Sequence, residues 1–113
     1  MQTWEISTLD IQPRHPEVLA SDEGGRVIVL HLPAGERLQE HQVHEHAWLV
    51  VVAGAVEISG PGPGAETVAG GPGLLAEFEP NERREVAATE DARLLLLLSP
   101  WPGEGHPSNR DPG

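Results

Sequence analysis

The chain has 113 residues, with 38% hydrophobic residues, 13 glycines, 11 prolines and a formal net charge of −11. This length predicts one domain with a single core, and the high glycine and proline content favours short strands over long helices. The acidic balance excludes the basic surface that nucleic acid or an anionic membrane requires. With no cysteine in the chain, disulfides, thiolate metal sites and cysteine nucleophiles are also excluded.

No targeting or membrane segment is visible in the sequence. The first ten residues, MQTWEISTLD, lack the basic and apolar regions of a signal peptide. No apolar run approaches the length of a membrane span. We therefore expect a cytoplasmic protein with no membrane partner.

The first half of the chain predicts strands separated by glycine and proline turns. We expect strands over residues 3–9, 26–32 and 47–53, and then over 56–59 after a tight hairpin turn at Gly54 and Ala55. Residues 10–25 are polar and carry two prolines, so we expect a connection there, with a helical turn over 16–20 as the alternative.

The second half continues the same pattern. We expect a short edge strand over 66–69 and strands over 74–79, 86–88 and 92–98, with a turn over 89–91. The leucine run at 94–98 is short and followed by a proline, which favours a strand over a helix. About eight short strands with no helix of note predict an all-β sandwich or barrel.

Three histidines precede the apolar strand that begins at Ala47. His41, His44 and His46 fall within six residues, and imidazole is the commonest protein metal ligand. On a regular strand, however, His41 faces the opposite side from His44 and His46. A site that uses all three histidines therefore needs irregular backbone between them; otherwise they are solvated residues of a loop.

The same stretch resembles the first motif of the cupins, small barrels of the double-stranded β-helix type. That motif runs Gly, five residues, His, one residue, His, three or four residues, Glu, six residues, Gly. Gly35, His41 and Gly54 match it, whereas Val43 stands at the second histidine and Ala47 at the glutamate.

A degenerate copy of the second cupin motif follows at Gly73–Val86. Pro80 matches the motif and Glu82 replaces its glycine. Counting from Pro80 puts Glu85 at the motif's histidine, and counting from the following strand puts Arg84 there. The resemblance implies a jelly-roll barrel over residues 1–100, with motif one at 35–54 and motif two at 73–86, and a Pro/Gly-rich tail over 101–113.

The resemblance also implies a choice about metal. Metal-binding cupins hold the ion inside the barrel, and here such a site would draw on His41, His44 or His46, and Glu85. It implies either one divalent transition metal (Fe, Mn, Ni or Zn) or none. The residues therefore leave two functions open, and with them whether the chain is an enzyme: a small cupin that binds a ligand in its barrel, or a metal-dependent oxygenase or isomerase using His41 with His44 or His46.

Two further residues are candidates for ligand binding. If Arg84 points into the barrel, it can pair with a carboxylate; the alternative is a surface arginine in an acidic run. Trp48 is a second candidate, with a role in the core or an interface as its alternative. Small cupins commonly pair, so the resemblance also implies a homodimer, for which Trp4 and Trp101 are candidate interface residues.

Overall fold

A computed structural model describes residues 1–41, 45–61 and 64–99, with only the backbone described for residues 39–41. These residues form seven strands and no helix. The strands are β1 (Glu17–Asp22), β2 (Gly25–Leu32), β3 (Arg37–His41), β4 (His46–Ser59), β5 (Thr67–Gly70), β6 (Leu75–Phe78) and β7 (Arg84–Ser99). In the described part of the chain, no helix is long and apolar enough to cross a membrane.

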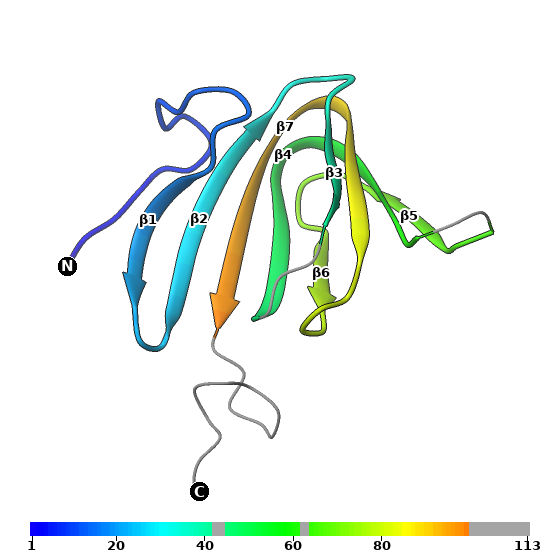
Figure 1. The fold of residues 1–113 in the computed structure, drawn as a ribbon. Helices are drawn as coiled ribbons and strands as arrows, with labels where there is room; N and C mark the ends of the chain where they lie inside the picture. Colours follow the sequence, from blue (N-terminus) through cyan, green and yellow to red (C-terminus); the bar gives the residue numbers. More distant parts are fainter. Residues whose placement is uncertain (42–44, 62–63, 100–113) are drawn as a thin grey trace, which may run out of the picture.

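The two longest strands, β4 and β7, form an antiparallel ladder that runs through the whole fold. It extends from the pair His46–Ser99 to the pair Ser59–Glu85. At one end β7 pairs with β2 and β4 pairs with β6; at the other end β7 pairs with β3 and β4 pairs with β5. Figure 1 shows the ladder bending between these ends, so that the strands form the two facing layers of a jelly roll.

The bend in the ladder depends on Gly54. Its φ is +79°, and a Cβ at this position would lie 1.9 Å from the carbonyl oxygen of Asp91. The register shifts on both sides of Gly54, between Val51 and Val56. The turns predicted at 54–55 and 89–91 are therefore wrong: both segments are bends inside continuous strands, because irregular ladder pairs can redirect a strand without ending it.

An exposed carboxylate ties the neighbouring loop to this bend. Asp91 accepts a hydrogen bond of 3.0 Å from the backbone N–H of Ala34, and its other oxygen lies 3.3 Å from Nε2 of His31. The backbone N–H and then His31 hold the pKa of Asp91 below its usual value. The loop between β2 and β3 is thereby anchored to β7.

Some of the strands predicted from the sequence are present in the structure, and others are not. The strands expected at 26–32, 66–69 and 74–79 correspond to β2, β5 and β6. The strand expected at 3–9 is wrong, since residues 6–8 form a turn. Strands β1 and β3 were missed, because both are polar edge strands whose only support is their neighbour in the sheet.

Strand alternation separates an inner from an outer face. The inner face holds the core, which includes Leu30, Leu49, Val51, Val86 and Leu94, each at most 2% exposed. On the outer face, cross-strand pairing forms two rows of apolar side chains. One row runs across the sheet through Val27, Leu97 and Trp48, and the other through Leu95, Val50 and Leu75. We call these six residues the outer apolar face.

The bend at Gly54 gives a direct test of this architecture. We expect Gly54→Ala to lower the free energy of unfolding by roughly 3 kcal/mol or more, because backbone atoms of β7 occupy the space of the new methyl group. Gly35→Ala is the matched control: φ there is +86°, but a Cβ added at this position would meet no atom within 4 Å. Its cost should stay near the conformational penalty of about 1–2 kcal/mol. Equal losses in urea denaturation would contradict the close approach at Gly54.

Candidate ligand pocket and outer-face cluster

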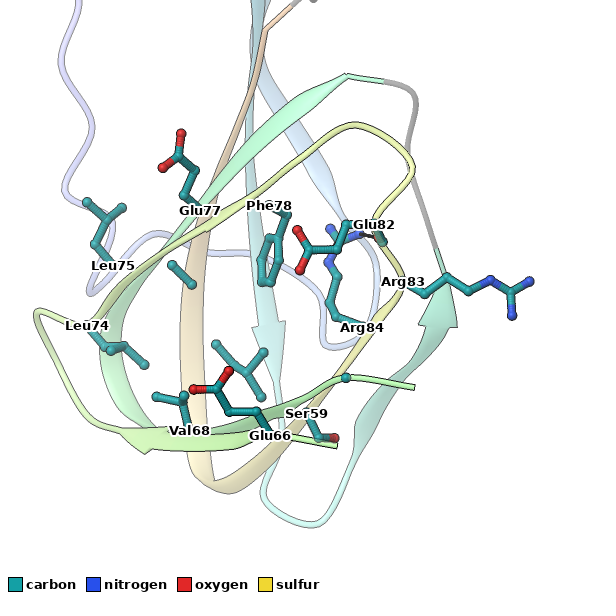
Figure 2. Close-up of a pocket in the computed structure, with 13 residues that line it drawn as sticks. Ser59, Glu66, Val68, Leu74, Leu75, Glu77, Phe78, Glu82, Arg83 and Arg84 are labelled. Atoms are coloured by element: carbon teal, nitrogen blue, oxygen red, sulfur yellow. Dashed lines mark hydrogen bonds between the residues drawn. The ribbon is translucent and has the colours of Figure 1, made fainter. Parts of the chain in front are cut away.

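A pocket of about 310 Å³ opens between β4, β5, β6 and the turn that leads into β7. Its walls are mainly apolar, with a few polar groups at the mouth, and Figure 2 shows several of these side chains converging on it. The lining side chains are Ile58, Ser59, Glu66, Val68, Leu74, Leu75, Ala76, Glu77, Phe78, Glu82, Arg83 and Arg84.

Arg84 is the buried charge of this pocket. Its exposed fraction is 3%, which makes it the one buried charged residue in the described part of the chain. Its guanidinium carbon lies 4.4 Å from the centre of the Phe78 ring, within range of a cation–π interaction. Nη1 donates to the backbone oxygen of Glu82 at 3.4 Å. Burial lowers the pKa of Arg84, and the charge of Glu82 opposes that shift.

The position of Arg84 follows from the alternation of β7. Arg84, Val86 and Ala88 are buried on the inner face, while Glu85 points to the other side. There Glu85 forms an ion pair of 3.0 Å with Nη1 of Arg37. Of the two residues that could correspond to the histidine of motif two, the structure therefore places Arg84 inside the barrel and Glu85 outside.

The turn between β6 and β7 holds the polar rim of the pocket. Asn81 has a φ of +67°, which reverses the chain. The carboxylate of Glu82 accepts a hydrogen bond of 2.9 Å from the backbone N–H of Glu79, and the backbone N–H of Glu82 donates to the oxygen of Glu79 at 3.0 Å. These hydrogen bonds hold the carboxylate of Glu82 in place, and Figure 2 shows Glu82 beside Arg84.

His46 and Trp48 lie on the outer face of β4, on the other side of the strand from the core residue Ala47. Their rings stack with centroids 4.3 Å apart and planes inclined by 17°. Nε2 of His46 lies 2.6 Å from Oε2 of Glu77. One ligand atom from each of His46, Glu77 and Glu79 lies within 4.8 Å of the others. We call these three residues the outer-face cluster.

The predicted metal ligands are only partly brought together. His44 lies outside the described residues, and of His41 the structure describes the backbone, which pairs with that of Arg84. His46 and Glu85 belong to different groups, since His46 contacts Glu77 and Glu85 contacts Arg37. Trp48 does not share the pocket with Arg84, because it sits on the opposite face of the sheet. The metal-binding and ligand-binding roles of these residues stay predictions.

The described interior of the barrel does not fit the metal that cupins commonly hold. Ala47, at the place of the motif-one glutamate, is fully buried in the core and offers no ligand atom. Arg84, at the place of the motif-two histidine, brings a positive charge that repels a cation. These residues therefore support no chemical step through an interior metal.

Known structures share this architecture at low sequence identity. An RmlC-like cupin protein from Desulfovibrio desulfuricans aligns with a TM-score of 0.76 and 18% identity, over 88% of this chain and 96% of that chain. KdgF from a Halomonas species aligns with a TM-score of 0.71 and 21% identity, over 88% and 95%. The cupin domain of Cnp3 from Schizosaccharomyces pombe gives 0.72 and 15%, over 86% and 72%.

These similarities define the chain as a small protein with the cupin fold, a jelly roll of the double-stranded β-helix type. No protein-family model matches the sequence, and no curated protein matches it either. The degenerate motifs account for this physically: the fold needs the strands and turns, but not the metal ligands that make cupin sequences recognisable.

Sequence reasoning missed three residues of these sites. Phe78, Glu77 and Glu79 all lie in the strand expected over 74–79. Phe78 was not predicted as a partner of Arg84, and the two glutamates were not predicted as neighbours of His46. Their alternation, Glu–Phe–Glu, is the available signal, since it predicts one buried aromatic between two carboxylates on the other face. Which face meets His46 depends on the pairing of β6 with β4.

A stability measurement separates a structural from a functional Arg84. We expect Arg84→Met to change the free energy of unfolding by less than about 2 kcal/mol, because removing the cost of desolvating a charge offsets the loss of its contacts with Glu82 and Phe78. Leu94→Ala is the control for a buried side chain at 0% exposure, and should cost about 2–5 kcal/mol. A loss above about 2 kcal/mol for Arg84→Met in urea denaturation would show a structural role.

Proposed function

We propose that the protein is a small cupin that binds a small carboxylate-bearing ligand in its barrel, with Arg84 as the group that receives the carboxylate. The observation that carries the proposal is a guanidinium that is 3% exposed and lines the pocket. A charge at such a place costs stability, and residues of binding sites are commonly retained despite that cost.

The physical gain on binding favours an anion. A desolvated guanidinium forms charge-assisted, bidentate hydrogen bonds with a carboxylate, and these are stronger in a low-dielectric pocket than in water. Phe78 holds the guanidinium from one side. The pocket volume of about 310 Å³ is at the low end for small-molecule sites, so the ligand should be small.

The remaining wall defines the rest of the ligand. Ile58, Val68 and Leu74 offer an apolar surface, which suits a short aliphatic or aromatic body. The carboxylates of Glu66 and Glu82 lie at the rim. Together with the formal net charge of −11, they disfavour ligands with several negative charges, because the pocket is lined by three glutamates and two arginines, of which only Arg84 is buried. A single carboxylate on an apolar body matches both features.

The alternative function is a metal-dependent cupin enzyme of the oxygenase or isomerase type, using His41 with His44 or His46. One divalent transition metal, Fe, Mn, Ni or Zn, would be its cofactor. What supports a metal is the outer-face cluster, in which His46 lies close to two carboxylates. Of that cluster only Glu77 lines the pocket, and His46 and Glu79 do not, so it supports metal binding at the edge of the pocket and not catalysis inside the barrel.

We also propose that the protein is cytoplasmic and forms a homodimer. The outer apolar face supports the dimer: it joins half-buried side chains on adjacent strands to Leu75, which is 59% exposed. Burying such a surface against a second copy removes apolar area from water, which is the main driving force of association.

The ligand proposal is tested with matched pairs of small molecules. We expect hexanoate and benzoate to raise the melting temperature, and hexanamide, benzamide and benzylamine to have no effect, because only the carboxylates can form charge-assisted hydrogen bonds with the guanidinium of Arg84. At a ligand concentration of 100 times Kd, the gain in stability is about 2.7 kcal/mol. Titration calorimetry then gives the dissociation constant for each carboxylate.

Two variants assign the effect to the pocket. Arg84→Met should abolish the shift, while Arg26→Gln should keep it, because Arg26 is an exposed residue of β2 and does not line the pocket. Equal binding of the acids and the amides, binding of benzylamine alone, or an unchanged shift in Arg84→Met would each contradict the carboxylate site.

The homodimer is tested by light scattering. We expect twice the mass of one chain for the natural sequence and the mass of one chain for Leu75→Glu, because the new charge is buried by the second copy. Val18→Glu is the control: Val18 is 50% exposed but lies on the edge strand β1, outside the outer apolar face. A single-chain mass for the natural sequence would contradict the dimer.

A further inference from the structure

We propose that His46, Glu77 and Glu79 form a divalent transition-metal site on the outer face of the barrel, at the edge of the carboxylate pocket and without Arg84. The site lies where β6 pairs with the beginning of β4. It differs in place and in ligands from a site inside the barrel, and it does not depend on the identity of the pocket's ligand.

The register of β4 and β6 brings the three side chains together. Ala47 pairs with Phe78 and Trp48 pairs with Glu77. Because the strands are antiparallel, His46, which precedes Ala47, lies opposite Glu79, which follows Phe78. Ala47 and Phe78 are buried in the core. Their neighbours His46, Glu77 and Glu79 therefore share the outer face, because side chains alternate along a strand.

The imidazole of His46 is held in a fixed orientation. It stacks on Trp48 at 4.3 Å, which limits rotation of the ring. Nε2 is shielded from solvent and makes no aligned hydrogen bond within the described part of the chain, although Oε2 of Glu77 is 2.6 Å away. Two ligand atoms about 2 Å from one metal ion lie roughly 3 Å apart, so this ion-pair contact already brings both atoms close enough to share an ion after a small outward shift of Glu77.

The charge of the cluster favours a divalent ion. Two carboxylates and a neutral imidazole carry −2, while the side chains of Arg14 and Arg37 pair with Glu36 and Glu85, away from the cluster. A divalent cation cancels this charge and relieves the repulsion between the carboxylates. The formal net charge of −11 also raises the local concentration of cations.

The ligand atoms indicate the class of metal. One imidazole nitrogen and two carboxylate oxygens suit Zn²⁺, Co²⁺, Ni²⁺ or Mn²⁺, whereas Ca²⁺ and Mg²⁺ prefer oxygen alone. Three protein ligands leave at least one position for water. Glu77 is half exposed, with 52% of its side chain accessible, so the ion can enter from solvent without a change in the fold.

The site also has a structural consequence for the pocket. Ala76, Glu77 and Phe78 all line the pocket from β6, and Glu77 is also one of the three residues of the outer-face cluster. A cation that joins Glu77 and Glu79 to His46 cross-links β6 to β4. It therefore braces one wall of the pocket without touching the ligand.

The test uses tag-free full-length protein and the metal ions alone. We expect calorimetry to show one Zn²⁺ per chain, with at least tenfold weaker binding in Glu77→Gln and in Glu79→Gln, and no saturable binding of Ca²⁺. Both glutamates are exposed, so these variants should fold. Co²⁺, which quenches nearby indoles, should lower the tryptophan fluorescence, because Trp48 contacts the ligand His46.

Matched variants distinguish the outer site from an interior one. Glu85→Gln and His41→Ala should bind Zn²⁺ as the natural sequence does, and Trp48→Phe should keep Zn²⁺ binding but lose the Co²⁺ quenching. Three results would overturn the proposal: no stoichiometric Zn²⁺; unchanged affinity in Glu77→Gln and Glu79→Gln; or loss of Zn²⁺ in Glu85→Gln or His41→Ala. Carboxylate binding to the pocket is measured separately, so either proposal can fail alone.

Discussion

The fold depends on one bent ladder, the antiparallel pairing of β4 with β7. These two strands contribute to both layers of the jelly roll, and every other described strand except β1 pairs directly with one of them. Two long strands can belong to two layers only if the ladder bends without breaking. Gly54 allows this, because it takes a positive φ and lets the backbone of Asp91 approach closely.

The side chains of β4 and β7 also form part of the interior pocket. β7 presents Arg84 inward at the end where the two layers separate, and β4 contributes Ile58 and Ser59 to the same pocket. The one buried charge in the described part of the chain is therefore positive. It is the basis of the anion site that we propose.

Neighbouring residues of β6 contact different groups on the two faces of the sheet. Phe78 supports Arg84 from the inner face, and Glu77 reaches His46 from the outer face. One short strand thus contributes side chains to both of the proposed sites, Phe78 to the pocket and Glu77 to the outer-face cluster. This arrangement needs no special backbone, since successive residues of a strand point to opposite faces.

Local sequence patterns were enough to establish the all-β class, the acidic character and the order of the two cupin-like motifs. Glycines, prolines and β-branched runs are local signals, and β2, β5 and β6 follow them. The folded chain was needed to show that the bends at Gly54 and at 89–91 continue their strands. It was also needed to show that Arg84 rather than Glu85 faces inward, and that His46 meets Glu77. The physical reason is that alternation gives any strand two equivalent faces, and only long-range pairing and burial choose which one meets the core.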